Sequence, residues 1–167
     1  MSETPRCSAL VTGASGQDGQ YLCERLNRAG VAVHGVARAD TVPERMAGMD
    51  GNVRWHYGAL DDAHALAELL DSVAPEQIYH LAAPTHVAKS FEDPSTITLE
   101  IVASTQRLLE AIRLHAPGAR LFYASSAEIF GEPDEVPQNE QTPLNPVSPY
   151  GAAKAFATHL TRIYREA

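Results

Sequence analysis

Short apolar runs alternate with longer segments of helical periodicity along most of this sequence. The alternation is typical of repeated strand–helix–strand units, in which parallel strands form one sheet. We therefore expect an α/β fold with a doubly wound parallel sheet of order 3-2-1-4-5 and helices on both faces. The five predicted strands are Cys7–Val11, Val31–Ala37, Val53–His56, Gln77–Ala82 and Arg120–Ser125.

The segments between these runs carry apolar residues at spacings of three and four, which predicts amphipathic helices. In the first of these segments, Tyr21, Leu22 and Leu26 fall near one face, which we expect to be buried. The predicted helices are Gln20–Ala29, Asp61–Ser72, Pro94–His115 and Pro149–Glu166.

Capping residues and helix breakers mark the ends of these elements. Ser148 is suited to cap the last helix, with the proline that follows as its first residue. Asp61 or Asp62 is suited to cap the second helix. Gly131–Pro149 holds five prolines and no periodicity, and Arg38–Gly51 is polar, so both are predicted to be loops.

Three glycines with the spacing G-x-x-G-x-x-G stand between the first strand and the first helix, at Gly13, Gly16 and Gly19. The first permits a tight turn, the second lets backbone N–H groups approach a pyrophosphate, and the third allows close packing of helix on sheet. The helix N-terminus adds a favourable field for an anion. This context predicts a Rossmann-type fold that binds a dinucleotide, with a purely structural turn as the alternative.

The end of the second strand indicates which dinucleotide is bound. An acidic side chain there suits a ribose 2′-hydroxyl, whereas an arginine suits a 2′-phosphate. Arg38 holds this place and favours NADP over NAD. Asp40 weakens this prediction, because it could pair with Arg38 or contact the ribose itself. The alternative for Arg38 is a solvated surface cation.

Near the end of the chain, a phenol and an ammonium stand one helical turn apart. Tyr150 and Lys154 are four residues apart and share a helix face. The ammonium favours the phenolate form, which suits a general base, and it could also hydrogen-bond a nicotinamide ribose. Together with the glycine turn, the pair predicts hydride transfer at a hydroxyl group. The alternative is two ordinary residues of a helix surface.

Polar residues also follow the fourth and fifth strands, where the carboxyl ends of parallel strands border the ligand crevice. Ser126 could hydrogen-bond the substrate oxygen, and Glu128 could take a proton next to a new ketone. Thr85, His86 and Ser90 are expected at the same crevice. The alternatives are turn and cap roles for the serine and glutamate, and simple packing for the histidine.

Composition excludes several other classes of function. The net charge of −8 argues against a general nucleic-acid binder. No run of roughly 18 apolar residues occurs, so no membrane span is expected, and Met1–Pro5 lacks a signal-peptide pattern. The two cysteines, Cys7 and Cys23, form neither a disulfide framework nor a metal site. They are expected to be reduced thiols of a cytoplasmic protein.

These motifs together resemble the extended short-chain dehydrogenase/reductase family and, within it, the GDP-mannose 4,6-dehydratases. The resemblance covers nearly all 167 residues. Gly-Gln-Asp-Gly and Pro-Gln-x-Glu are its more specific elements, whereas Tyr-x-x-x-Lys is common to the superfamily. The segments that carry it are Thr12–Leu22, His34–Arg38, His56–Leu60, Thr85–Glu92, Ala124–Gly131, Val136–Pro143 and Ser148–Lys154.

The resemblance implies a redox-neutral, NADP-dependent conversion of GDP-mannose to GDP-4-keto-6-deoxymannose. In it, Tyr150 takes the C4 hydroxyl proton with help from Ser126, Glu128 takes the C5 proton, and water leaves from C6. It also implies a homo-oligomer formed through Pro94–His115 and Pro149–Glu166. The implied cofactor residues are Gly13, Ser15, Gly16, Gln17, Asp18, Gly19, Arg38, Ala59, Leu60, Leu81, Ala82, Ala83, Tyr150 and Lys154, and the implied substrate residues are Thr85, His86, Ser90, Ser126 and Glu128.

The sequence departs from the family at Ala59, where an aspartate near the adenine is usual, and at Ser126, where threonine is usual. The match extends over about the N-terminal half of such an enzyme. We therefore expect residues 1–167 to form an NAD(P)-binding domain without the C-terminal substrate-binding portion. The alternatives are an NADP-binding module without catalysis, or a nucleotide-sugar epimerase or reductase of the same family. Glu128 favours dehydration over epimerisation.

Overall fold

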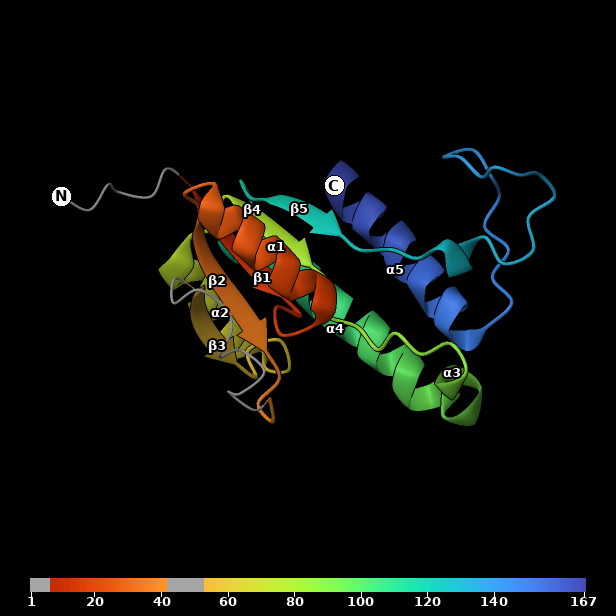
Figure 1. The fold of residues 1–167 in the computed structure, drawn as a ribbon, viewed down its shortest axis with the longest axis horizontal. Coiled ribbons are helices and arrows are strands. Elements are labelled where there is room, and N and C mark those ends of the chain that lie inside the picture. The colour runs from red at the N-terminus through yellow and green to blue at the C-terminus, as the bar shows by residue number, and fades with distance from the viewer. Residues whose placement is uncertain (1–6, 42–52) are drawn as a thin grey trace. The chain divides into compact units, whose positions relative to one another are not determined.

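The structure, a computed structural model, describes residues 7–41 and 53–167. Its five strands are all parallel and form one sheet of order β3-β2-β1-β4-β5 (Figure 1). The predicted strand order is therefore confirmed. The strands are β1 (Ser8–Thr12), β2 (Ala32–Ala37), β3 (Val53–Tyr57), β4 (Gln77–His80) and β5 (Arg120–Tyr123). The helices are α1 (Gln17–Arg28), α2 (Ala63–Val73), α3 (Lys89–Glu92), α4 (Pro94–His115), the 3₁₀ helix η2 (Ala127–Ile129) and α5 (Pro149–Glu166).

The chain divides into two compact units. The first comprises Met1–Ala82 and Glu110–Ala124, and the second comprises Ala83–Leu109 and Ser125–Ala167. The first unit holds the whole sheet with α1 and α2. The second holds α3, η2 and α5, and α4 contributes residues to both units.

One face of the sheet is covered by α1, which buries small and branched side chains. Val11 and Val33 of the sheet pack in one cluster with Cys23 and Leu26 of α1. Tyr21 was predicted to lie on this buried face, but it is 65% exposed. It is two residues from the buried Cys23, which places it on the opposite side of a helix with 3.6 residues per turn.

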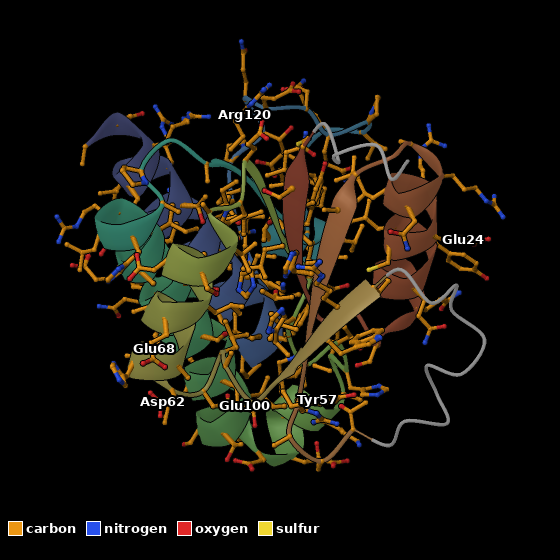
Figure 2. All side chains as sticks on the ribbon, turned by 90° about the vertical axis from the view of Figure 1, so that its left-hand side faces the viewer. Glu24, Tyr57, Asp62, Glu68, Glu100 and Arg120 are labelled. Atoms are coloured by element: carbon orange, nitrogen blue, oxygen red, sulfur yellow. The ribbon has the colours of Figure 1, made fainter. Side chains whose placement is uncertain are left out.

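The other face of the sheet lies toward α2, so the first unit has helices on both faces. Figure 2 shows α1, with Glu24, and α2, with Glu68, on opposite sides of the sheet. The capping residue of α2 is Asp62, whose Oδ1 accepts hydrogen bonds from the backbone N–H groups of His64 and Ala65. Leu66, Leu69 and Leu70 of α2 are buried.

The larger differences from the predicted boundaries lie at the start of α1 and at the ends of β4 and β5. Helix α1 begins three residues earlier than predicted because Gly16 itself is the N-cap. Strands β4 and β5 end two residues earlier than predicted; after β4, the apolar residues Leu81 and Ala82 continue into irregular backbone. The short helices α3 and η2 were not predicted. Within the predicted loop Arg38–Gly51, residues 42–51 lie outside the described residues, as does Met1–Pro5.

The described part of the chain holds no helix long and apolar enough to cross a membrane. Within the same residues, no three or more histidine, cysteine, aspartate or glutamate side chains gather where they could hold a metal ion. Cys7 and Cys23 are both free thiols. The thiol of Cys23 is buried between α1 and the sheet, and burial raises its pKa to about 11.

Two histidines on neighbouring strands form a stacked pair within the sheet. His34 Nδ1 lies 3.0 Å from His56 Nε2, and the ring centroids are 5.3 Å apart. Burial lowers the pKa of both rings, and Arg54 lowers them further; the charge of His56 also lowers the pKa of His34. The folded chain therefore favours two neutral rings.

We expect this pair to make the fold sensitive to acid. A histidine whose folded pKa lies below its unfolded value of about 6.5 stabilises the fold above that value, and the contribution is lost as the pH falls through the folded pKa. Urea unfolding between pH 7.5 and 5 should show a decline that is smaller in His34→Phe. The exposed His159 provides the control, because His159→Asn should leave the decline unchanged. Equal slopes in wild type and His34→Phe would contradict this.

Candidate functional site

The predicted glycine turn brings the ends of β1 and β4 into close contact. Gly13 has φ +71°, and a β-carbon there would lie 2.8 Å from the backbone nitrogen of Ala82. A β-carbon on Gly19 would overlap the carbonyl oxygen of Gly13. Glycine is therefore required at both positions by backbone atoms, which cannot move aside as a flexible side chain can.

The turn leads directly into the N-terminus of α1. Gly16 caps the helix without a side-chain hydrogen bond, and its N–H donates to the carbonyl of Gly13 at 2.9 Å. The side chain of Gln20 donates to the carbonyl of Ser15 at 2.9 Å, which closes the turn. Gly16, Gln17 and Asp18 are exposed. The N-cap glycine thus offers no side-chain acceptor to the first N–H groups of this 12-residue helix, an arrangement that suits a phosphate group.

The other predicted coenzyme residues of the first unit follow the ends of β2, β3 and β4. Because these strands are parallel neighbours of β1, their carboxyl ends share one edge of the sheet. The backbone joins the exits, since Gly13 N–H donates to Val36 O and Gly58 N–H donates to Ala37 O, both at 3.0 Å. The residues at these exits are Arg38, Ala59, Leu60, Leu81 and Ala82, and Ala83 is the first residue of the second unit.

Arg38 lies at the exit of β2, as predicted, and forms an exposed ion pair. Its Nε lies 3.5 Å from Oδ1 of Asp40, and both side chains are more than three-quarters exposed. Of the two roles considered for Asp40, pairing with Arg38 is the one that the structure contains. Such exposed pairs contribute little to stability, so the guanidinium stays available to a phosphate.

The predicted phenol and ammonium lie in the first turns of α5. Ser148 caps this helix, because its Oγ accepts the N–H of Gly151 at 3.0 Å, and Pro149 is the first helical residue. Tyr150 and Lys154 follow one turn apart, and both are buried. The helix start therefore fixes the position of both functional groups.

The serine and glutamate that follow β5 lie against the start of α5. Ser126 caps η2, and its Oγ accepts the N–H of Glu128 at 3.2 Å. A β-carbon on Gly151 would lie 2.6 Å from the carbonyl oxygen of Glu128. The structure thus brings the backbone of Glu128 next to the residue after Tyr150. Ser126 therefore has a cap role in which its Oγ accepts, and its hydroxyl proton can still donate to another group.

A second link between these segments was not predicted. Ser125 Oγ and Thr158 Oγ1 are 2.7 Å apart, and Thr158 Oγ1 donates to the carbonyl of Lys154 at 2.8 Å. Since Thr158 uses its proton there, Ser125 donates to Thr158. Spacing alone gives a partial signal, because Thr158 lies one helical turn after Lys154.

The proline-rich loop between η2 and α5 is closed at its neck. The φ of Gly131 is +55°, and a β-carbon there would overlap the carbonyl oxygen of Asn145. Asn145 N–H donates to Ile129 O at 3.1 Å, and its side-chain amide donates to Glu132 O at 3.4 Å. The two ends of the loop are therefore joined immediately before α5.

The remaining predicted substrate residues lie around α3. Thr85 and His86 are exposed. Ser90 is fully buried, and its hydroxyl donates to the carbonyl of Val87 at 2.6 Å. That hydrogen bond occupies the proton of Ser90, whereas the side chains of Thr85 and His86 are accessible to a ligand.

The ammonium group of Lys154 has a perturbed pKa. Burial lowers its pKa from 10.5 to about 8. The ammonium form predominates near neutral pH, but its desolvation is unfavourable unless an anion or hydroxyl groups lie nearby. A lysine with a pKa perturbed by burial is a candidate functional residue.

The lowered pKa of Lys154 predicts a rise in stability at alkaline pH. Between about pH 8 and 10.5 the unfolded chain holds a proton that the folded chain has released, so the free energy of unfolding rises with pH. Relative to Lys154→Met, the wild type should gain up to about 3 kcal/mol across this window. Urea titrations at several pH values test this, with the exposed Lys89→Met as control. A constant difference would contradict it.

Comparison with known proteins connects this geometry to a family. The family model described as GDP-mannose 4,6 dehydratase matches residues 10–167. The chain is 39% identical to GDP-mannose 4,6 dehydratase of Cricetulus griseus, over 98% of this chain and 47% of that protein. It is 40% identical to GDP-mannose 4,6-dehydratase of Vibrio cholerae serotype O1, over 95% of this chain and 45% of that protein. The chain thus spans about half the length of these relatives.

Solved structures give the same assignment at the level of the fold. UDP-glucose 4-epimerase from Brucella ovis, solved in complex with NAD, matches with a TM-score of 0.88 and 29% identity over 96% of this chain and 48% of that one. UDP-glucose 4-epimerase from Bifidobacterium longum matches with a TM-score of 0.84 and 24% identity over 93% and 48%. These likenesses confirm the Rossmann-type fold, and the match over residues 10–167 shows that the chain belongs to the GDP-mannose 4,6-dehydratase family.

Proposed function

We propose that this chain forms the coenzyme-binding and catalytic half of an NADP-dependent GDP-mannose 4,6-dehydratase, a lyase. The observation that carries the proposal is the presence, in one member of this family, of both the glycine turn and the buried Tyr150–Lys154 pair. Because the chain spans about half the length of its relatives, the activity is proposed for this chain together with the remaining half.

The first unit fits a dinucleotide at the glycine turn. Gly13 and Gly19 allow the backbone of the turn to pack closely on itself and on Ala82, and the first N–H groups of α1 provide donors for the pyrophosphate. Arg38 would meet a 2′-phosphate, which is why NADP is proposed over NAD. Ala59 is a small buried residue at the exit of β3, so it offers the coenzyme no polar contact through its side chain.

The residues of the second unit supply the proton transfers. Bound NADP⁺, held at the glycine turn and by Arg38, would supply a hydride acceptor for sugar C4 and a hydride donor for C6, which would make the reaction redox-neutral. Tyr150 takes the C4 hydroxyl proton, and Ser126 donates a hydrogen bond to the same oxygen with the proton that its cap role leaves free. Glu128 takes the C5 proton, which the C4 ketone acidifies, and water leaves from C6. Tyr150 and Glu128 then hold two protons. One completes the water that leaves from C6, and the other returns to C5.

Arg38 provides a test of the coenzyme assignment. Arg38→Ala should weaken NADPH binding about tenfold or more, since a charge-assisted hydrogen bond to phosphate is lost, and should leave NADH binding nearly unchanged. Fluorescence titration of the full chain with both coenzymes measures this. Arg120→Ala is the matched control, because Arg120 is exposed and is the first residue of β5, at the sheet edge opposite the glycine turn. Equal losses for both coenzymes, or none, would remove the support for NADP.

The proposed activity is tested with this chain alone and with the C-terminal half of the Vibrio cholerae relative joined to it or co-expressed. Incubation with GDP-mannose and NADP⁺ should yield GDP-4-keto-6-deoxymannose and water in the completed protein. Turnover of a different nucleotide sugar would refute the proposed substrate. Saturable NADPH binding without turnover in the completed protein would favour the second candidate, a nucleotide-binding module, which the half-length match makes reasonable.

We also propose that the protein self-associates and works in a reducing compartment such as the cytoplasm. Large apolar side chains are exposed on α4, at Leu99, and on α5, at Phe156 and Ile163. Surfaces of this kind are suited to an interface between copies of one chain. The two free thiols support the compartment. Sedimentation of the full chain over a range of concentrations tests the association.

A further inference from the structure

The ends of β1 and β4 contain a buried polar pair to which the proposed function gives no role. Thr12 and His80 are the last residues of these strands and are partners in the parallel register. Both are almost fully buried, at 0% and 1% exposed. Thr12 Oγ1 and His80 Nδ1 are 2.7 Å apart, and Oγ1 also accepts the backbone N–H of Ala82 at 3.3 Å. The His80 ring lies 5.7 Å from that of Tyr123.

These contacts favour one arrangement of the protons. The N–H of Ala82 can only donate, so Thr12 Oγ1 uses a lone pair to accept it. We assign the hydroxyl proton of Thr12 to His80 Nδ1, which lies 2.7 Å from Oγ1 and can accept it. A neutral His80 with its proton on Nε2 satisfies this arrangement. A proton on Nδ1 would instead turn the hydroxyl proton of Thr12 away from His80 within the buried part of the sheet. Leaving that donor without His80 as its acceptor is unfavourable.

The pair lies directly beside the glycine turn. Thr12 precedes Gly13, and Gly13 approaches the backbone nitrogen of Ala82 so closely that no β-carbon fits between them. The backbone N–H of Leu81 also donates to Thr12 O at 3.2 Å. The hydroxyl of Thr12 therefore joins the two strand exits that border the proposed coenzyme site.

We propose that His80 is a positioning residue for the coenzyme: by accepting the Thr12 proton at Nδ1, it orients Oγ1 toward the Ala82 N–H and holds the exits of β1 and β4 at the separation that the dinucleotide requires. His80 does not touch the coenzyme and acts through Thr12. The inference rests on the proposed function, because Gly13, Leu81 and Ala82 are proposed coenzyme contacts.

The test measures NADPH affinity and stability in parallel on the full chain. Thr12→Val and His80→Leu remove one partner each and should raise the Kd for NADPH about tenfold, the effect of one lost hydrogen bond on a preorganised site. Thr12→Ser and His80→Asn keep a hydroxyl and an acceptor, and their Kd should stay within about twofold of wild type. Thr105→Val is the matched control, because Thr105 is buried and its hydroxyl donates to Ile101 O within α4. It should lower stability without changing the Kd.

A spectroscopic measurement examines the proton positions directly. In ¹⁵N-histidine-labelled chain, two-dimensional NMR should report His80 as the neutral Nε2–H tautomer, with Nδ1 unprotonated and hydrogen-bonded. In Thr12→Val the Nδ1 signal should shift, because its donor is gone. A protonated Nδ1 in the wild type would overturn the proposed orientation, even if a variant fails to fold.

The outcomes separate this inference from the function on which it rests. If the wild-type chain binds neither NADPH nor NADH, the proposed function fails and the inference fails with it. If the wild type binds NADPH but Thr12→Val and His80→Leu bind it equally well, the inference alone is overturned. Stability losses without a change in Kd would show a role in folding only and would also overturn it.

Discussion

Tyr150→Phe is expected to lower kcat for GDP-mannose about 10³-fold in the completed protein, because a general base of this kind contributes roughly 10²- to 10⁴-fold to the rate. The substitution removes one oxygen from a buried side chain at a capped helix start. The packing of α5 should therefore persist, and the free energy of unfolding should change little. The loss should appear in kcat rather than in KM, because the phenol acts on the proton that is transferred in the transition state.

The control for this substitution lies on the same helix. Tyr164→Phe removes the same atom from a half-buried tyrosine in the last turns of α5 and should leave kcat unchanged. NADPH affinity, measured by fluorescence titration, should differ little between wild type and Tyr150→Phe. If Tyr150→Phe retains more than about a tenth of the wild-type kcat, the tyrosine is not the general base, and the proposed mechanism is wrong.

Gly13→Ala is expected to abolish measurable NADPH binding and to lower the free energy of unfolding by about 2–4 kcal/mol. Two effects add here. The φ of +71° is unfavourable for any residue with a β-carbon, and that carbon would lie 2.8 Å from the nitrogen and 2.9 Å from the α-carbon of Ala82. Because the obstructing atoms are backbone, relief requires the exits of β1 and β4 to separate.

Gly30 separates these two effects. Its φ is +77°, but a β-carbon there would meet no atom within 4 Å. Gly30→Ala should therefore cost only the backbone strain, about 1–2 kcal/mol, and should leave NADPH binding intact. Urea unfolding and coenzyme titration of both variants measure the difference. Similar losses of binding in the two variants would show that the close approach of Gly13 to Ala82 does not shape the coenzyme site at the glycine turn.

Much of the fold could be predicted because its signals are local. The alternation of apolar runs with helical periods gave the strand order, and helix α4 has the predicted bounds, Pro94–His115. The end of β4 could not be predicted, because Leu81 and Ala82 continue the apolar run after the ladder of hydrogen bonds has stopped. The pattern of apolar residues indicates which residues are buried, whereas a strand ends where its backbone hydrogen bonds to the neighbouring strand end.

The candidate site was predictable only where its residues are close in sequence. The spacing of Tyr150 and Lys154 and the cap at Ser148 follow from neighbouring residues. The link between Ser125 and Thr158 joins residues 33 apart, so the local spacing of Lys154 and Thr158 indicates the helix face of Thr158 but not its partner. Roles that depend on contacts between distant segments, including the coenzyme and substrate roles proposed here, stay predictions until binding is measured.

The closed neck at Gly131 and Asn145 has a consequence for how this protein can change. Residues 132–144 leave and return at one point, where Asn145 bonds to Ile129 and Glu132. Lengthening, shortening or grafting a new peptide into that excursion would leave the spacing of Glu128 and Tyr150 unaltered. The loop of residues 132–144 is therefore a place where evolution or engineering can add a binding segment without moving the proposed catalytic residues.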